Sequence, residues 1–134
     1  MASIRKEVTI DATPVAVWDA LRDIGALHRR LVPGFVTDVR LDGNSRIVTF
    51  GNGRVVREII VDLDDQARRL VWSAVGGSLS HHNASAQVFA EGPSSTRFVW
   101  IADILPNELA PTIGSMMEQG IATVKRTLES ASRG

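Results

Sequence analysis

Alternating apolar and polar residues occupy most of the chain between residues 4 and 105. A period of two predicts strands with one face buried and the other in water. The strands expected on this pattern cover residues 4–10, 36–41, 46–50, 55–63, 69–75, 80–89 and 96–105. Turn-forming segments rich in Gly and Asn, such as residues 42–44 and 51–53, are typical of antiparallel hairpins.

Helical spacing replaces the alternation in two regions. After the first strand, Thr13 or Asp11 can cap a helix with Pro14 in its first turn, and a second short helix is expected over residues 24–31. From Asn107 onward the apolar residues fall on one helical face. That face consists of Leu109, Ile113, Met116 or Met117, Gly120, Ile121, Val124 and Leu128.

Consecutive strands without helices between them cannot build a parallel doubly wound sheet, because each parallel connection needs a long crossover. The expected fold class is α+β, with an antiparallel sheet covered by the terminal helix. One helix is narrower than seven strands, so a cavity between them is expected. The 134 residues are expected to form a single domain, residues 1–134.

Composition narrows the range of partners. The chain has no Cys, which excludes disulfides and thiolate metal sites, and fifteen basic residues balance fifteen acidic ones. Without a basic stripe, nucleic acid is not an expected partner. No apolar run approaches the roughly 20 residues that span a bilayer, so we expect no stable membrane insertion and a cytoplasmic location. No motif indicates a nucleophile or a metal hydrolase, so neither a metal nor a cofactor is expected.

Several patches of the sequence resemble a known family. The patches are residues 53–58, 63–65, 68–72, 76–77 and 96–100, the last lying shortly before Pro106. They are similar to motifs of bacterial polyketide cyclase/dehydrase-like proteins. The order of the elements resembles the START-like (SRPBCC) superfamily over nearly the whole chain. That superfamily also includes the birch pollen allergen family and the plant abscisic acid receptors.

The resemblance implies a helix-grip fold. In it, a curved seven-stranded antiparallel sheet, two short helices and one long C-terminal helix surround an apolar cavity. The function implied is binding or transport of a hydrophobic small molecule, either a lipid or a polyketide-like compound. One alternative is a polyketide cyclase/dehydratase-type enzyme using acid/base chemistry. A second alternative is a protein-interaction module, and both a monomer and a homodimer remain open.

The phase of each strand indicates which side chains face the cavity. On residues 80–89, the set that contains His82 and Ala84 is the more apolar one and is expected to point inward. Trp72 is expected inward on the strand before it. His81 and His82 point to opposite faces and cannot chelate one metal ion.

The last strand can be placed in two phases. Phe98 and Trp100 are favoured inward over Val99, because the opposite phase would bury Arg97 and Asp103 without partners. The pattern of the abscisic acid receptors, counted back from Pro106, implies that opposite phase.

Glu58 lies on a strand whose pattern fits either phase. Resemblance to the abscisic acid receptors implies that it faces inward, as a base or a hydrogen-bond anchor; the alternative is a solvated carboxylate paired with a neighbouring Arg. His82 is the weak candidate for a proton donor, against the alternative of a strand-end histidine in water. The expected ligand-binding residues are Glu58, Trp72, His82, Ala84, Phe98, Trp100, Ile113 and Met117.

Overall fold

The computed structural model describes all 134 residues and contains one seven-stranded antiparallel sheet. Its strand order is β1-β7-β6-β5-β4-β3-β2. The strands are β1 (Ala2–Ile10), β2 (Val36–Asp42), β3 (Ser45–Phe50), β4 (Val55–Asp64), β5 (Arg69–Val75), β6 (His81–Gly92) and β7 (Ser95–Leu105). The seven strands expected from the alternation are therefore confirmed, with small differences at their ends.

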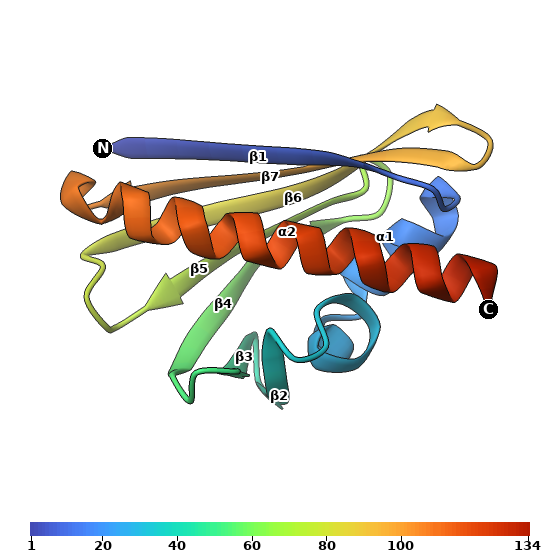
Figure 1. Ribbon diagram of the computed structural model, residues 1–134. Coiled ribbons are helices and arrows are strands. Elements are labelled where there is room, and N and C mark those ends of the chain that lie inside the picture. Colours follow the sequence, from blue (N-terminus) through green and yellow to red (C-terminus); the bar gives the residue numbers. More distant parts are fainter.

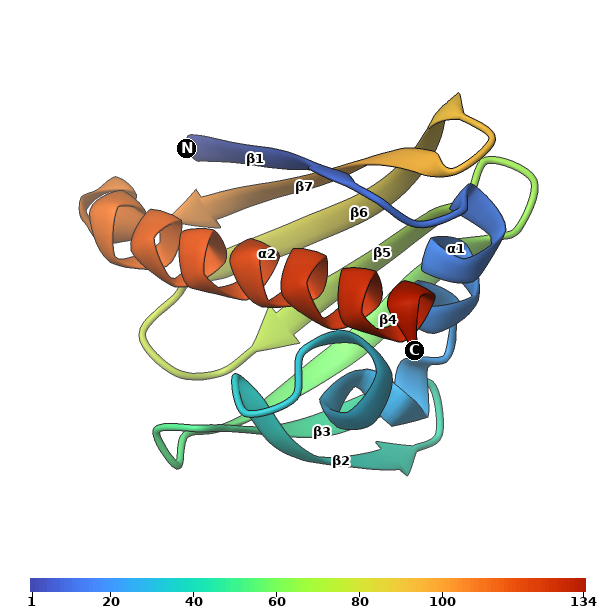
Figure 2. The ribbon, with the colours of Figure 1, turned by 45° about the vertical axis from the view of Figure 1, so that its right-hand side comes forward.

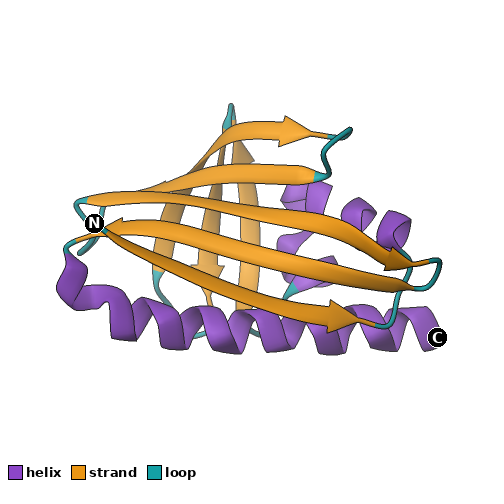
Figure 3. Cartoon of the chain, turned by 90° about the horizontal axis from the view of Figure 1, so that it is seen from above, coloured by secondary structure: helices purple, strands orange, loops and turns teal.

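Helix α2 (Ala110–Arg133) runs along one face of this sheet (Figure 1). The sheet curves over the helix, so that the strands at its two edges run in different directions (Figure 3). Irregular pairing in β2, β4 and β6 accompanies this curvature, as bulges increase strand bending. This arrangement is the helix-grip fold, and no helix in it is both long and apolar enough to span a bilayer.

Helix α1 (Pro14–Arg22) begins where its sequence predicts. The Thr13 side-chain oxygen accepts a hydrogen bond from the Ala16 N–H at 3.1 Å, and Pro14 stands in the first turn. With the short turns that follow it, α1 lies beside the C-terminal half of α2 (Figure 2).

The second short helix expected over residues 24–31 is present, but it is not a regular α-helix. The segment forms a 3₁₀ turn, η1 (Ile24–Ala26), and then a single π-helical turn, η2 (Leu27–Leu31). The π turn is closed by the Val32 N–H, which donates to the Leu27 carbonyl at 2.9 Å. Leu31, at the end of this turn, and Val32, which follows it, are both buried.

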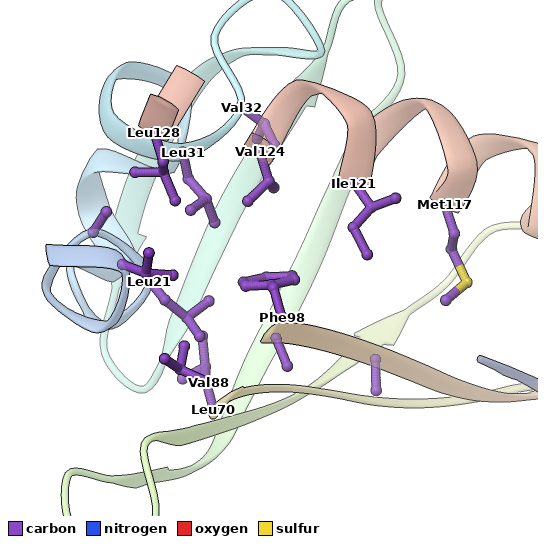
Figure 4. Close-up of a cluster of buried hydrophobic side chains, with 14 of the residues drawn as sticks. Leu21, Leu31, Val32, Leu70, Val88, Phe98, Met117, Ile121, Val124 and Leu128 are labelled. Carbon is purple, nitrogen blue, oxygen red and sulfur yellow. The ribbon is translucent and has the colours of Figure 1, made fainter. Parts of the chain in front are cut away.

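The core lies between α2, the α1 region and strands β5 to β7 (Figure 4). Its labelled members include Leu70, Val88 and Phe98 from the sheet. The buried residues of α2 are Met117, Gly120, Ile121, Thr123, Val124 and Leu128. No residue of α2 before Met117 is buried, so the first two turns of the helix cover the sheet less tightly. A short 3₁₀ turn, η3 (Asn107–Leu109), connects β7 to this end of α2.

Candidate functional site

A cavity of about 850 Å³ opens beneath the loosely packed start of α2, and we call it the vestibule. Its wall comes from the segment before β2, the β3–β4 hairpin, the end of β5 with the loop after it, the start of β6 and the first turns of α2. The wall consists of Gly34, Phe35, Phe50, Gly51, Asn52, Arg54, Val55, Val56, Glu58, Ala74, Val75, Gly76, Gly77, Ser78, Leu79, His82, Pro111, Thr112, Ile113, Ser115, Met116 and Gln119. Only 9 of these 22 residues are hydrophobic, so the vestibule is a mixed polar and apolar surface.

A second cavity of about 80 Å³ lies deeper, and we call it the inner chamber. Its wall is apolar at 13 of 16 positions, and its polar members are Arg46, Glu58 and His82. Five residues belong to both walls, namely Phe35, Phe50, Glu58, His82 and Met116. The two compartments therefore adjoin, with Glu58 and His82 at their boundary.

Glu58 faces inward and forms a buried ion pair. Its Oε1 accepts from the Arg46 Nε at 2.8 Å, and the two side chains are 9% and 3% exposed. Arg46 also donates to the Ile24 carbonyl at 3.3 Å, and its guanidinium lies 5.7 Å from the centroid of the Trp72 ring. These contacts offset the desolvation of the two charges. The second oxygen of Glu58 has no hydrogen-bond partner within the protein and is available at the boundary.

Arg46 was not identified from the sequence, although a signal existed. Arg46 and Glu58 are directly opposite in the β3–β4 hairpin, where Thr49 pairs with Val55 next to the turn. Counting outward from the turn at residues 51–53 would have found the pair. The expectation that Glu58 pairs with a neighbouring Arg holds, but the pair is buried and not solvated.

His82 occupies a gap between two strands. The pairing of β5 with β6 ends at Trp72 and Ala84, although both strands continue. Beyond that point the Ala74 N–H donates to His82 Nδ1 at 2.9 Å, so the imidazole replaces the missing backbone partner. The Ser73 hydroxyl donates to the His82 carbonyl on the same side.

Burial lowers the pKa of His82, an effect that the negative charge of Glu58 partly opposes. Because Nδ1 accepts a hydrogen bond, the neutral ring carries its proton on Nε2. No group of the protein binds Nε2, and the ring borders both compartments. His82 is thus a fixed hydrogen-bond donor at the boundary.

The residues that line the inner chamber show which side chains of β7 point inward. Phe98 and Trp100 line the inner chamber, whereas Val99 is buried but lines neither cavity. The centroid of the Trp100 ring lies 6.3 Å from that of Trp72. Against α2, a Cβ added to Gly120 would lie 2.8 Å from Trp100 Cζ3, so the glycine makes room for the indole.

The expected ligand-binding residues divide into two groups. Those that line a cavity are Glu58, Trp72, His82, Phe98, Trp100 and Ile113. Ala84 and Met117 line neither cavity and belong to the core. Met117 points toward the sheet (Figure 4), whereas Met116, about 100° away around the helix, borders both compartments.

No group of three His, Cys, Asp or Glu side chains could hold a metal ion. The chemistry of the site therefore rests on one buried ion pair, one neutral imidazole and two indoles around an apolar space. Such a site can orient a ligand through a few hydrogen bonds while its walls bury apolar surface.

Several solved structures share this fold. A protein from Thermobifida fusca, solved by solution NMR, is 26% identical, with a TM-score of 0.78 over 93% of this chain and 91% of that one. A START superfamily protein from Mycobacterium smegmatis is 12% identical, with a TM-score of 0.76 over 98% and 97% of the two chains. Norcoclaurine synthase from Thalictrum flavum, solved in complex with dopamine and hydroxybenzaldehyde, is 13% identical, with a TM-score of 0.71 over 93% and 84%. Identities as low as those of the last two establish a common fold alone.

Among curated proteins, none matches the chain. Residues 1–129, in contrast, match the family described as polyketide cyclase / dehydrase and lipid transport. That match covers almost the whole sequence, in agreement with the helix-grip fold and its cavity under the long helix. The chain therefore belongs to the polyketide cyclase/dehydrase and lipid transport family.

Proposed function

We propose that this protein binds and carries a hydrophobic small molecule in its two-part cavity. The observation that carries the proposal is a large open vestibule that adjoins a small apolar chamber beneath α2, with five wall residues in common. Ligand sites commonly have volumes of about 300–1,000 Å³, which includes the size of the vestibule. The compact apolar end of a ligand would fill the chamber, and its larger part would occupy the vestibule.

The polar atoms at the boundary indicate how such a ligand would be oriented. The free oxygen of Glu58 can accept a hydrogen bond from a ligand hydroxyl, and His82 Nε2 can donate one to a ligand oxygen. Phe35 and Phe50, whose ring centroids are 5.7 Å apart in an edge-on arrangement, border both compartments and offer apolar contact between them. An amphiphilic ligand with a polar group near its middle suits this arrangement.

A cyclase or dehydratase is the second candidate, because Glu58 and His82 face the same boundary. In that reaction Glu58 would accept a proton from the ligand, and His82 Nε2 would donate one to a carbonyl oxygen. Norcoclaurine synthase indicates that the same fold can host an enzyme. Two restraints favour the carrier: Arg46 engages one oxygen of Glu58, and the Ala74 N–H engages His82 Nδ1.

Native mass spectrometry of the purified protein, followed by denaturing extraction, tests the carrier function. We expect a bound lipid or polyketide-like compound, or a mass shift with members of a hydrophobic ligand panel. Val56→Trp, which fills the vestibule wall, should abolish the shift. Val61→Trp on the same strand is the matched control, because Val61 is 56% exposed and lines neither cavity. An unshifted mass across the panel, or equal binding by both variants, would contradict the proposal.

Turnover separates the carrier from the enzyme. Glu58→Gln alone would leave the buried Arg46 charge unpaired, so the informative variant is the double substitution Arg46→Gln with Glu58→Gln. If the protein is a carrier, this double variant should still bind the extracted compound. If it is an acid/base enzyme, the double variant should bind the compound but lose turnover by a factor of about 10² or more.

A further inference from the structure

One positive charge in the vestibule wall has no partner within the protein. Among the 22 wall residues, only Arg54 and Glu58 carry a formal charge at neutral pH, because burial lowers the pKa of His82. Glu58 is neutralised by its ion pair with Arg46. The guanidinium of Arg54, in contrast, forms no ion pair or hydrogen bond; only the backbone N–H of this residue donates, to Asn52 Oδ1 at 3.0 Å. One side chain therefore gives the vestibule wall a net positive charge.

Arg54 lies at the outer end of the vestibule. A Cβ added to Gly77 would lie 3.6 Å from Arg54 Nη2, so the guanidinium reaches from the β3–β4 turn to the loop after β5. Arg54, Val56 and Glu58 follow the period of two, and all three line the vestibule. Four residues of extended chain, at about 3.3 Å each, separate Arg54 from Glu58 by about 13 Å along the strand. Arg54 is exposed and Glu58 is buried, so the unpaired cation marks the entrance.

The charged residues nearest to this wall in the chain lie outside it. Arg57, the next arginine of β4, has its Nη2 2.9 Å from Asp42 Oδ2 and lines neither cavity. In α2, Glu118 Oε2 lies 3.0 Å from Lys6 Nζ, and Glu108 belongs to the turn before this helix. Neither of these carboxylates lines a cavity. A ligand that enters the vestibule therefore meets a single cation with its donors free.

We infer that the ligand carries a carboxylate at its outer end, which Arg54 binds at the entrance of the vestibule; this inference rests on the proposed cavity function. A guanidinium presents a fork of N–H donors that fits the two oxygens of a carboxylate. One unpaired cation matches one negative charge, and the free oxygen of Glu58 disfavours a carboxylate placed deeper. The substrate class is therefore an amphiphilic carboxylic acid, whose apolar part extends inward past Val56 toward Glu58 and His82.

Pairs of acids and their primary amides test this inference, because the amide keeps the shape of the carboxylate and removes its charge. The pairs are decanoate with decanamide, and 6-phenylhexanoate with 6-phenylhexanamide. Affinities are measured by calorimetry for the natural protein, for Arg54→Gln and for the control Arg57→Gln, whose arginine lines neither cavity. The affinity ratio of acid to amide should fall by about threefold to tenfold in Arg54→Gln, as expected for one partly exposed ion pair. The ratio should remain unchanged in Arg57→Gln.

A second measurement does not depend on the affinity of a variant. The side-chain Nε–H signal of Arg54 is the arginine signal absent from the ¹⁵N–¹H spectrum of Arg54→Gln. In the natural protein the acid should move this signal downfield, and the matched amide should move it much less. Equal movement with acid and amide, or an unchanged affinity ratio in Arg54→Gln, would overturn the inference while leaving the cavity function intact. Failure of all four compounds to bind the natural protein would instead count against the cavity function, and with it against this inference.

Discussion

Gly120 provides a sharp test of how α2 packs against the inner chamber. Glycine in a helix interior is less favourable than alanine by about 0.8–1 kcal/mol, so Gly→Ala normally stabilises an exposed helix. At Gly120, however, the added Cβ would lie 2.8 Å from Trp100 Cζ3 and 3.3 Å from Phe35 Cε2. Overpacking of this kind costs about 1–3 kcal/mol. The balance predicts that Gly120→Ala changes the free energy of unfolding by between no effect and a loss of about 2 kcal/mol.

Gly114, on the same helix, is the matched control. A Cβ added there would meet only Ile4 Cγ2, at the ordinary contact distance of 3.8 Å. Gly114→Ala should therefore stabilise the protein by about 0.5–1 kcal/mol. The two variants should differ by the overpacking cost of about 1–3 kcal/mol, measured by urea unfolding of both under identical conditions.

The same pair of variants also reports on the cavity. The Trp100 ring can relieve the contact only by moving away from α2, which changes the chamber that it lines. Gly120→Ala should weaken the binding of an extracted ligand, and Gly114→Ala should not, since Gly114 lines neither compartment. Equal stabilisation by both substitutions, with unchanged binding, would refute the packing described for Trp100.

Three further outcomes are expected. Glu58→Gln should lower the free energy of unfolding by about 3–5 kcal/mol, because it leaves the buried charge of Arg46 without a partner. The double variant with Arg46→Gln should recover a large part of that loss. Equal urea midpoints for the single and double variants would contradict the buried ion pair. Burial lowers the folded-state pKa of His82, so the contribution of this residue to stability is complete above its unfolded pKa of about 6.5 and declines as the pH falls below that value. Urea unfolding between pH 7.5 and 5 should show this decline, and His82→Gln should flatten it; parallel profiles would rule out the buried imidazole as its source. Trp18→Phe should destabilise the protein by about 1 kcal/mol through the lost hydrogen bond to Asp65, and Asp65→Asn, which keeps an acceptor, should cost less; the reverse order would be inconsistent with that bond.

Much of the fold could be predicted because its signals are local. Alternation reports the pleat of each strand, and Gly- and Asn-rich turns report the hairpins, so the seven strands and the long helix were recognisable in sequence order. The spacing of apolar residues predicts a short helix over residues 24–31, but it does not distinguish an α-helix from the 3₁₀ and π turns that the structure contains. Periodicity does not carry that information.

The inward-facing side chains of the candidate site could be predicted only for a strand in which one of the two possible phases would bury charged residues. On β7 the inward phase of Phe98 and Trp100 follows from the charges of the opposite phase, and Arg97 does pair with Glu91 outside the cavity walls. On β4 both phases are equally apolar, so the direction of Glu58 could not be decided from that strand alone. Its partner Arg46 lies on another strand, and only the hairpin register brings the two together.

The sequence by itself determined the elements of this protein, their order and the amphipathic stripe of α2, because each follows from spacing within a few residues. The tertiary structure decided where α2 crosses the sheet. That crossing places Met116 on the cavity wall and Met117 in the core, separates the vestibule from the inner chamber, and leaves the Trp100 N–H without a partner. These features depend on contacts between residues far apart in the chain, such as Gly120 with Phe35 and Trp100, and no local pattern encodes the distance between such surfaces.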